Sequence, residues 1–403
     1  MLQGFIFILK RLGFIYKMKI FFMSTHANQG TGYGRVANKI TNHLVEQGHD
    51  VTFFAFQNYP GQAIEDRFID PRIKFIDGYK EDPDSPKGFG DKVIKKHFDA
   101  ENPDVLFLYN DLSVCVSVIK LIDPKCKVVC YLDIVYPWED IERFEFLKSR
   151  CDFCYTFLNC WREHLVNDLG WEPRKVSVLY HGIDTDRFKY VQNAKSLLGF
   201  DEDDFIVLNM NRNSYRKQWC VTIKAFMNFL RMNNCNPKIK LFCGCMSKTE
   251  DGFDLLELIK VECMKLNLEY ESIINKNIFS NPKPLHATDE YINLVYNACD
   301  VGMNTCCGEG FGLTTLEHGL LDKPQVVTGI PALRETMKNF AYFVEPRTWT
   351  TVSKYESHGG EIAMCEADDF TTELSRVYAG KDIQRTLDPT CFEWERVLKN
   401  LVL

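Results

Sequence analysis

Several features that this sequence lacks narrow its class before any motif is considered. The 403 residues contain no Asn-x-Ser/Thr site for N-glycosylation, which agrees with a cytoplasmic location. They also lack an excess of positive charge. The net charge of −7 argues against nucleic acid as a general partner, although a local basic cleft can still bind a phosphate. Neither an internal repeat nor a long low-complexity segment is present, and the 45% of hydrophobic residues suits an ordinary globular protein of two or three domains.

Cysteine is abundant, with 16 residues scattered through apolar runs, as at Cys126 and Cys130. In a chain of this length, such scatter indicates buried, reduced thiols in a reducing compartment.

One group of cysteines has the spacing of a zinc site. Cys151 and Cys154 form a CxxC pair, and Cys160 and His164 follow closely. The segment CDFCYTFLN is strongly β-prone, however, and a strand would turn the first two thiols to opposite faces. We therefore favour packing in the core over zinc binding.

The N-terminal residues 1–17 are apolar but carry Lys10, Arg11 and Lys17. This run is too short to span a bilayer and lacks the cleavage site of a signal peptide. It suits an amphipathic helix in peripheral contact with a membrane surface. It equally suits an upstream extension, because MKIFFMST from Met18 has the pattern of a first strand.

The stretch GEGFGLTTLE, residues 308–317, organises the rest of the chain. Its three glycines allow close approach of the backbone and positive φ, and the threonines after them suit the start of a helix near Leu313. Free N–H groups at that start can bind an anion, and Glu309 and Glu317 bracket the turn. This combination suits a sugar, its phosphates and a ribose. From the spacing alone, a capped helix with two solvated acids is the alternative.

GEGFGLTTLE resembles the signature of the retaining GT-B glycosyltransferases, and of glycosyltransferase family four in particular. The resemblance implies an α/β fold of two Rossmann-like α/β/α domains that face each other across a cleft. It also implies a nucleotide-diphosphate sugar as the donor substrate. Glu309 would contact the donor sugar and Glu317 the ribose hydroxyls, and the donor-binding residues between them would be Gly310, Phe311, Gly312, Leu313 and Thr314.

A second glycine-rich turn follows the strand from Met18 and contains Gly30, Gly32 and Gly34. It has the layout of a dinucleotide-binding unit, but the next strand ends in Gln57 instead of the acid that would hold a ribose. Nicotinamide binding therefore does not fit. In the resembling family this turn faces the cleft, which makes Gly32 a donor-side and Tyr33 an acceptor-side residue. A merely tight turn is the alternative.

Asp133 ends a predicted strand, VVCYLDIVYP at residues 128–137, where open α/β sheets place functional side chains. The resembling family often has a histidine at about this point. We assign Asp133 to the acceptor side, with a strand-terminal turn residue as the alternative. His181, in HGIDTDRF, matches a family motif whose role is largely played by the backbone, so it is left out of the catalytic set.

A basic pair, Arg212 and Lys217, occupies the turn between a strand that ends near Met210 and a helix that begins near Gln218. Arginine binds phosphate oxygens with two N–H groups and lysine acts as a point charge, so the pair suits a diphosphate leaving group. A solvated basic turn is the alternative. The spacing matches the Arg/Lys pair of the resembling family, whereas Arg216 is expected to face solvent.

The resemblance also sets the predicted domain limits. Residues 1–188 form the acceptor-side domain, joined by a C-terminal helix at about 386–403 that crosses back, and residues 189–385 form the donor domain. Residues 281–290 occupy the place where the family holds the nucleobase, but their side chains do not distinguish guanine from uracil. Thr288 is expected to cap the following helix, with Glu290 in its first turn.

The predicted activity is transfer of a hexose from a GDP- or UDP-sugar to a hydroxyl of a glycan or other acceptor, with retention of anomeric configuration. Arg212, Lys217 and Glu309 are the predicted catalytic residues. No metal and no cofactor are required, because the basic pair neutralises the departing diphosphate. Two other functions stay open: a GT-B nucleotide-sugar epimerase, and a non-catalytic sugar-nucleotide-binding protein. The second need not keep all four charged residues, including Glu317.

Overall fold

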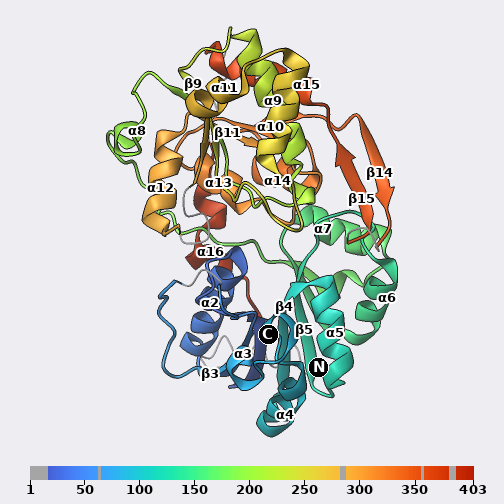
Figure 1. The fold of residues 1–403 in the computed structure, drawn as a ribbon. Coiled ribbons are helices and arrows are strands. Elements are labelled where there is room, and N and C mark those ends of the chain that lie inside the picture. Colours follow the sequence, from blue (N-terminus) through green and yellow to red (C-terminus); the bar gives the residue numbers. More distant parts are fainter. Residues whose placement is uncertain (1–16, 62–64, 282–286, 355–357, 381–386) are drawn as a thin grey trace.

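The computed structural model describes residues 17–61, 65–281, 287–354, 358–380 and 387–403, and it contains two parallel sheets in separate α/β units (Figure 1). The predicted fold class, two Rossmann-like domains, is confirmed. We call the unit around the first sheet the first domain and the unit around the second sheet the second domain. The predicted membrane-surface helix falls almost wholly on residues 1–16, outside the described residues.

The first sheet has the order β3-β2-β1-β4-β5-β6-β7, and all of its strand pairs are parallel. Its central strands are apolar on both faces because helices cover both sides, as in β1, where residues 20–23 are at most 1% exposed. The strands are β1 (Lys19–Thr25), β2 (Asp50–Phe56), β3 (Lys74–Asp77), β4 (Val105–Asp111), β5 (Lys127–Asp133), β6 (Phe153–Thr156) and β7 (Val176–Val178). The helices are α2 (Gly32–Glu46), α3 (Gly78–Glu81), α4 (Asp91–Glu101), α5 (Leu112–Ile122), α6 (Ile141–Arg150) and α7 (Asn159–Glu163).

The second sheet has the order β10-β9-β8-β11-β12-β13 and is also parallel. Its strands are β8 (Phe205–Asn209), β9 (Ile239–Cys243), β10 (Ile278–Ser280), β11 (Val301–Asn304), β12 (Gln325–Thr328) and β13 (Tyr342–Val344). The helices are α8 (Ala194–Leu197), α9 (Trp219–Met232), α10 (Leu255–Leu266), α11 (Tyr270–Asn277), α12 (Asp289–Ala298), α13 (Leu313–Gly319), α14 (Pro331–Thr336) and α15 (Ala367–Tyr378).

Local signals in the sequence fix several helix starts. Thr288 caps α12 by accepting a hydrogen bond from the amide of Tyr291, and Glu290 lies in the first turn, as expected. Asp111 caps α5 in the same way, through the amide of Val114.

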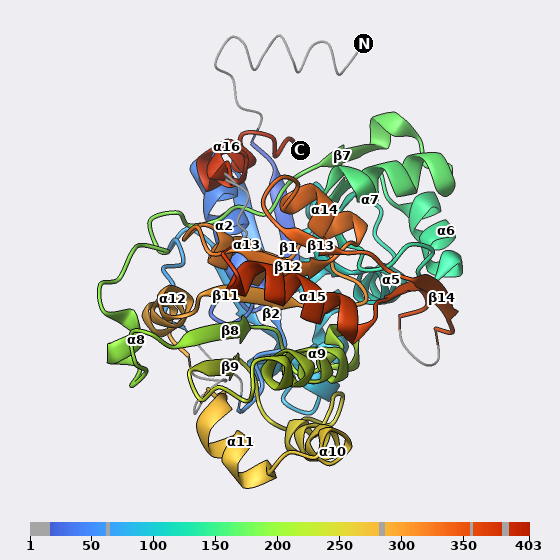
Figure 2. The same ribbon diagram turned by 90° about the horizontal axis from the view of Figure 1, so that it is seen from above.

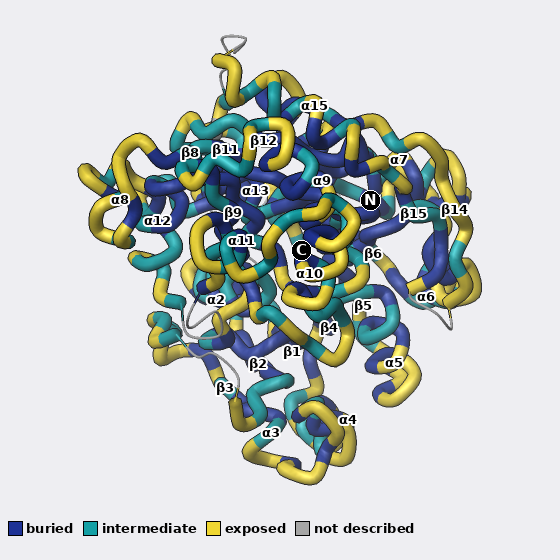
Figure 3. Tube along the Cα trace, turned by 45° about the horizontal axis from the view of Figure 1, so that its top comes forward, coloured by how far each residue is buried: buried dark blue, intermediate teal, exposed yellow. Residues whose placement is uncertain are grey.

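In both sheets the carboxyl ends of the strands point toward the other domain, so polar residues at these ends meet between the domains (Figure 1). Figure 3 shows the buried strands in dark blue beneath more exposed helices.

The C-terminal segment returns from the second domain to the first. Its helix α16 (Trp394–Leu398) packs against α2, and Ile183 forms a bridge with Glu393 (Figures 1 and 2). At the end of the chain, the Tyr155 hydroxyl donates to the carbonyl of Val402 at 2.6 Å.

One element was not expected from the sequence. Strands β14 (Thr348–Val352) and β15 (Gly360–Met364) form an antiparallel hairpin that leaves the second domain and reaches the first domain near α6 (Figure 1). None of the helices described in the structure is long and apolar enough to cross a membrane.

Replacing Trp394 with Ala is expected to lower the free energy of unfolding of the first domain by about 3 kcal/mol, because a buried indole ring leaves a cavity. Urea unfolding followed by circular dichroism measures this loss. Trp349→Ala is the matched control: this indole is 40% exposed, and its removal should cost well under half as much. Equal losses in the two variants would mean that α16 is not part of the first domain's core.

Candidate functional site

The glycine turn of residues 308–312 brings the two domains into contact. Gly312 has φ +91° and precedes α13, which begins at Leu313 as predicted. The expectation of positive φ is wrong for Gly308 and Gly310. At these two positions glycine is needed because the first domain approaches the backbone closely. A Cβ on Gly308 would lie 2.3 Å from Tyr136, and one on Gly310 would lie 2.0 Å from Oδ1 of Asp133. Only glycine leaves room for the first domain at these two positions.

Glu309 lies at the centre of a buried charge cluster. The Lys217 ammonium donates a hydrogen bond to its Oε2, and Arg216 Nη1 lies 3.5 Å from its Oε1. Burial by itself would raise the pKa of the Glu309 carboxyl, but the charges of Lys217 and Arg216 outweigh burial and hold the pKa below its usual value. Glu309 is therefore ionised at neutral pH, with two cations beside it.

The predicted basic pair is divided between the cavity and its rim. Lys217 is buried beside Glu309, whereas the Arg212 side chain is 72% exposed and its Nη2 donates to Asp251 at 2.6 Å. Arg216, expected to face solvent, instead points inward and donates to the carbonyl of Gly308 at 2.7 Å. The reason is the short 3₁₀ turn at Tyr215–Lys217, which directs two consecutive side chains to the same buried acid.

Glu317 is also buried and paired. Its carboxylate accepts from Arg35 Nη1 and, at 3.0 Å, from the Tyr296 hydroxyl. Arg35 belongs to α2 of the first domain, so this ion pair joins the domains. Arg35 is not among the site residues predicted from the sequence. The available signal was its place three residues after Gly32, beside the glycine-rich turn that was predicted to face the cleft.

Asp133 and Tyr33 form the first-domain wall of the site. The Tyr33 hydroxyl donates to Asp133 Oδ2 at 2.6 Å, while Asp133 Oδ1 is buried and has no hydrogen-bond partner among the described residues. Burial raises the pKa of the Asp133 carboxyl to about 6, against the lowering influence of Tyr33 and Arg216. This carboxyl is thus the acid in the site that gains or loses a proton near neutral pH.

His181 is packed rather than poised for proton transfer. Its Nδ1 lies 2.7 Å from the Tyr131 hydroxyl, and its ring lies against Phe157 and Phe311. Burial lowers its pKa to about 3, so the ring is neutral.

Two adjoining cavities connect these groups. The smaller one has a volume of about 230 Å³ and takes residues from both domains; among them are Gly32, Tyr33, Asp133, Arg212, Arg216, Lys217, Glu309, Gly310, Phe311, Gly312, Leu313 and Thr314. The larger one, of about 850 Å³, shares Gly32, Arg212 and Thr314 with it and continues to Glu317. Asn281 and Ala287 line this larger cavity, while residues 282–286 of the predicted base-binding stretch lie outside the described residues.

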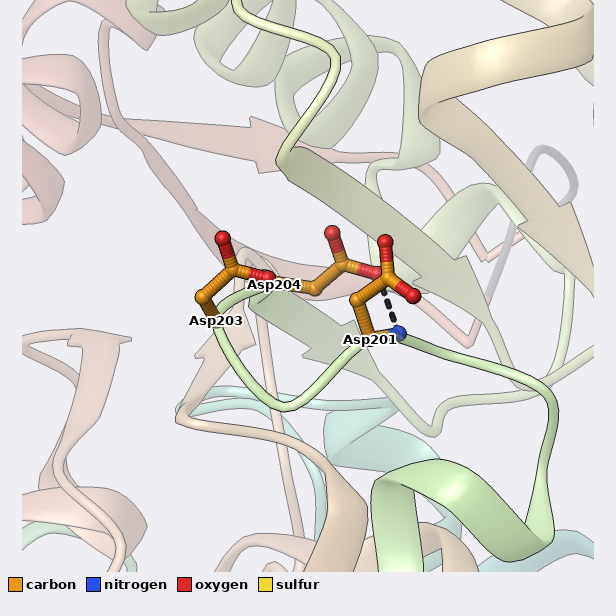
Figure 4. A group of neighbouring side chains, drawn as sticks. All are labelled: Asp201, Asp203 and Asp204. Carbon is orange, nitrogen blue, oxygen red and sulfur yellow. Dashed lines mark hydrogen bonds between the residues drawn. The ribbon is translucent and has the colours of Figure 1, made fainter.

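Groups with the chemistry of metal ligands lie elsewhere. Within the described ranges, only Asp201, Asp203 and Asp204 gather closely enough to hold a metal ion (Figure 4). Lys238 already pairs with the first two at 2.5 and 2.9 Å, and the group precedes β8 at the end of the strand opposite the cleft. The thiols of the CxxC pair are buried in the first domain and do not join such a group, so they pack in the core as favoured.

Comparisons with known proteins agree with this geometry. Residues 30–187 match the family model described as Glycosyltransferase Family 4. Among solved structures, HepE from Anabaena, determined with UDP and glucose, is 15% identical with a TM-score of 0.62, covering 95% of this chain and 97% of that one. Sucrose-phosphate synthase from Thermosynechococcus elongatus is 16% identical with a TM-score of 0.64, covering 95% and 92%. No curated protein sequence matches the chain.

The match to Glycosyltransferase Family 4 covers residues 30–187, and the solved structures show that the chain as a whole has the GT-B fold. The family match and the fold are both those of glycosyltransferase enzymes of the GT-B type, as the resemblance of the acid motif implied.

Asp133→Asn is expected to stabilise the protein increasingly as pH rises. The folded pKa of about 6 lies above the ordinary 3.8, so the stability due to the protonated carboxyl is complete below pH 3.8 and is lost as pH rises through 6. The loss is on the order of 3 kcal/mol, and asparagine avoids it while still accepting from Tyr33. Thermal melting of both proteins at pH 4.5 and 7.5 measures the difference, and an equal difference at the two values would contradict a buried Asp133 carboxyl.

Proposed function

We propose that this enzyme transfers a hexose from a UDP-sugar to a hydroxyl of a glycan or similar acceptor, with retention of configuration and without a metal ion. The observation that carries the proposal is the buried cluster of Lys217, Arg216 and Glu309, which faces Asp133 across the 230 Å³ cavity. A cation pair and a carboxylate on one wall suit a sugar diphosphate, and the opposite wall is left for the acceptor.

The cations supply the leaving-group chemistry. Lys217 and Arg212 both line the small cavity, and their charges would neutralise the diphosphate as the glycosidic bond breaks. Arg212 would exchange Asp251 for a phosphate oxygen, which its exposed position favours because an exposed ion pair is weak. Arg216 adds a third charge that the sequence analysis did not include.

The two acids hold the donor. Glu309, ionised beside Lys217, would accept hydrogen bonds from hydroxyls of the transferred sugar. Glu317 would accept from the ribose hydroxyls, for which it lies in the larger cavity next to the small one. Ribose binding there would replace the contact between Glu317 and Arg35.

The acceptor would enter from the side of Tyr33 and Asp133. Its hydroxyl oxygen would form the new bond to the anomeric carbon on the face that the diphosphate leaves, and its proton would pass to the departing phosphate oxygen. A carboxylate with one buried oxygen lacking a partner is a suitable acceptor of hydrogen bonds from sugar hydroxyls. This route needs no covalent nucleophile.

Two further observations support finer parts of the proposal. Solved structures with the same fold include HepE with UDP-glucose, which favours a uridine donor over a guanosine donor. All sixteen cysteines are free thiols, which supports the cytoplasm as the place of the reaction.

The deciding experiment is nucleotide release from a panel of UDP- and GDP-sugars, without acceptor and with a chelator present. Slow release of UDP from one donor is the expected result, because water can take the place of the acceptor. Release that appears only after metal is restored would overturn metal independence. Conversion of the donor to its epimer, with no release, would point to an epimerase.

Lys217→Ala is expected to lower turnover by about 100-fold or more, because the departing diphosphate loses its buried countercharge. Arg212→Ala should also lower turnover, but by a smaller factor, because Arg212 is more exposed than Lys217. Lys125→Ala provides a control away from both cavities, with an exposed ammonium paired to Asp123. Unchanged turnover in both cleft variants, with normal melting temperatures, would refute the leaving-group assignment.

A further inference from the structure

The turn that follows Asp133 has an unusual backbone. Residues 134–140 connect β5 to α6, and within them Trp138 has φ +59°, a left-handed conformation that is costly for a bulky side chain. Such strain persists only where the surrounding structure holds it, and it is concentrated at functional sites. The first domain contributes one support, a hydrogen bond from the Trp138 amide to Nε2 of His164 at 3.1 Å.

The second domain contributes the other supports through the β14–β15 hairpin. The amide of Glu361 donates to the carbonyl of Pro137 at 2.8 Å. Gly360, with φ +91°, lies so close to the turn that a Cβ there would be 2.5 Å from the Pro137 oxygen and 2.8 Å from the Glu139 nitrogen. The hairpin therefore touches the strained backbone itself, with no side chain between them.

A buried acid completes this contact. Glu139 is 3% exposed, accepts from the amide of Val135 at 3.4 Å, and lies 3.4 Å from Nδ1 of His358 on the hairpin side. Burial raises the pKa of Glu139, and the hydrogen bond to Glu139 raises the pKa of His358. The pair thus fastens the hairpin to the inner side of the turn, and the reaction proposed above does not use it.

Apolar packing links the same turn to the acid motif. Val135 and Tyr136 form a small buried cluster with Cys307, against which Ile362 of the hairpin packs. The amide of Ala363 in turn donates to the carbonyl of Cys307 at 2.9 Å. The hairpin therefore holds, at one place, the residues just after Asp133 and the residues just before Glu309.

We propose that the β14–β15 hairpin is a clamp that positions Asp133 against Glu309, with Gly360 and the Glu139–His358 pair as its positioning residues. The clamp touches neither cavity wall directly and acts through the turn at 134–140. The proposal rests on the proposed function for its effect on turnover. Its structural part, the hold on the turn, can be measured without any activity.

The sharpest test compares Gly360→Ala with Gly359→Ala. Both glycines have positive φ, +91° and +80°, so both variants strain the hairpin. Only the Gly360 variant pushes a methyl group into the turn, because a Cβ on Gly359 would meet nothing closer than Lys354 of the hairpin itself, at 3.3 Å. We expect hydrogen exchange of the amides of residues 134–136 and 138–140 to be about tenfold faster in Gly360→Ala than in Gly359→Ala. Turnover should be about tenfold lower in Gly360→Ala, with an unchanged KM for the donor.

Glu139→Gln keeps the volume and removes the charge, so it tests the clamp without a steric change. We expect faster exchange of the same amides and a lower kcat, with the KM for the donor within about twofold. Glu142→Gln is its control, since this exposed acid also pairs with the hairpin, through Lys354 at 2.7 Å, yet lies outside the turn.

Exchange at 134–140 that matches wild type in both Gly360→Ala and Glu139→Gln would overturn the clamp. Faster exchange with undiminished kcat would overturn its positioning role. If wild-type enzyme releases nucleotide from no donor, the proposed function fails on its own, and the exchange comparison still decides whether the hairpin holds the turn.

Discussion

The site depends on one steric constraint, the contact of the two domains at Gly308 and Gly310. Tyr136 and Asp133 of the first domain occupy the space that a Cβ would need at these positions. Because the contact is made by backbone, Asp133 comes close enough to Glu309 for both to line a cavity of only about 230 Å³. Any larger residue at either position would move the sheets apart and separate the two walls.

The charges of Glu309 and Glu317 in the cleft are each paired with cations. Glu309 is neutralised by Lys217 and Arg216, and Glu317 by Arg35 from the opposite domain. A buried acid without such a partner would carry a large desolvation cost, so the pairing makes ionised groups tolerable inside the interface. Under the proposed function, sugar and ribose hydroxyls would take the place of the cations beside each acid, and phosphate oxygens would take the place of the acid beside a cation.

The domain interface is fastened at both sides of the cleft. On the side of α12, Arg187 pairs with Asp289, near the Arg35–Glu317 pair. On the other side, the β14–β15 hairpin reaches the turn after Asp133 (Figure 1). In the described residues, the Asp133 wall of the small cavity, which belongs to the first domain, is thus supported by the second domain.

The sequence determined the features that a few neighbouring residues encode. Thr288 as a helix cap, Leu313 as a helix start and the apolar strands of the two sheets all follow from local pattern. These depend on backbone hydrogen bonding and on spacing within one element, which a short stretch of chain fixes by itself.

Only the tertiary structure decided which partners these residues meet. Arg35 and Glu317 are 282 positions apart, and the sequence around either residue does not indicate the other as its partner. Arg216 turns inward because it pairs with Glu309, a buried acid of a distant turn. Position 310 requires glycine because the side chain of Asp133 fills the space that a Cβ would need. Such contacts arise when two folded units dock, so their energies depend on surfaces that do not exist until both domains have formed.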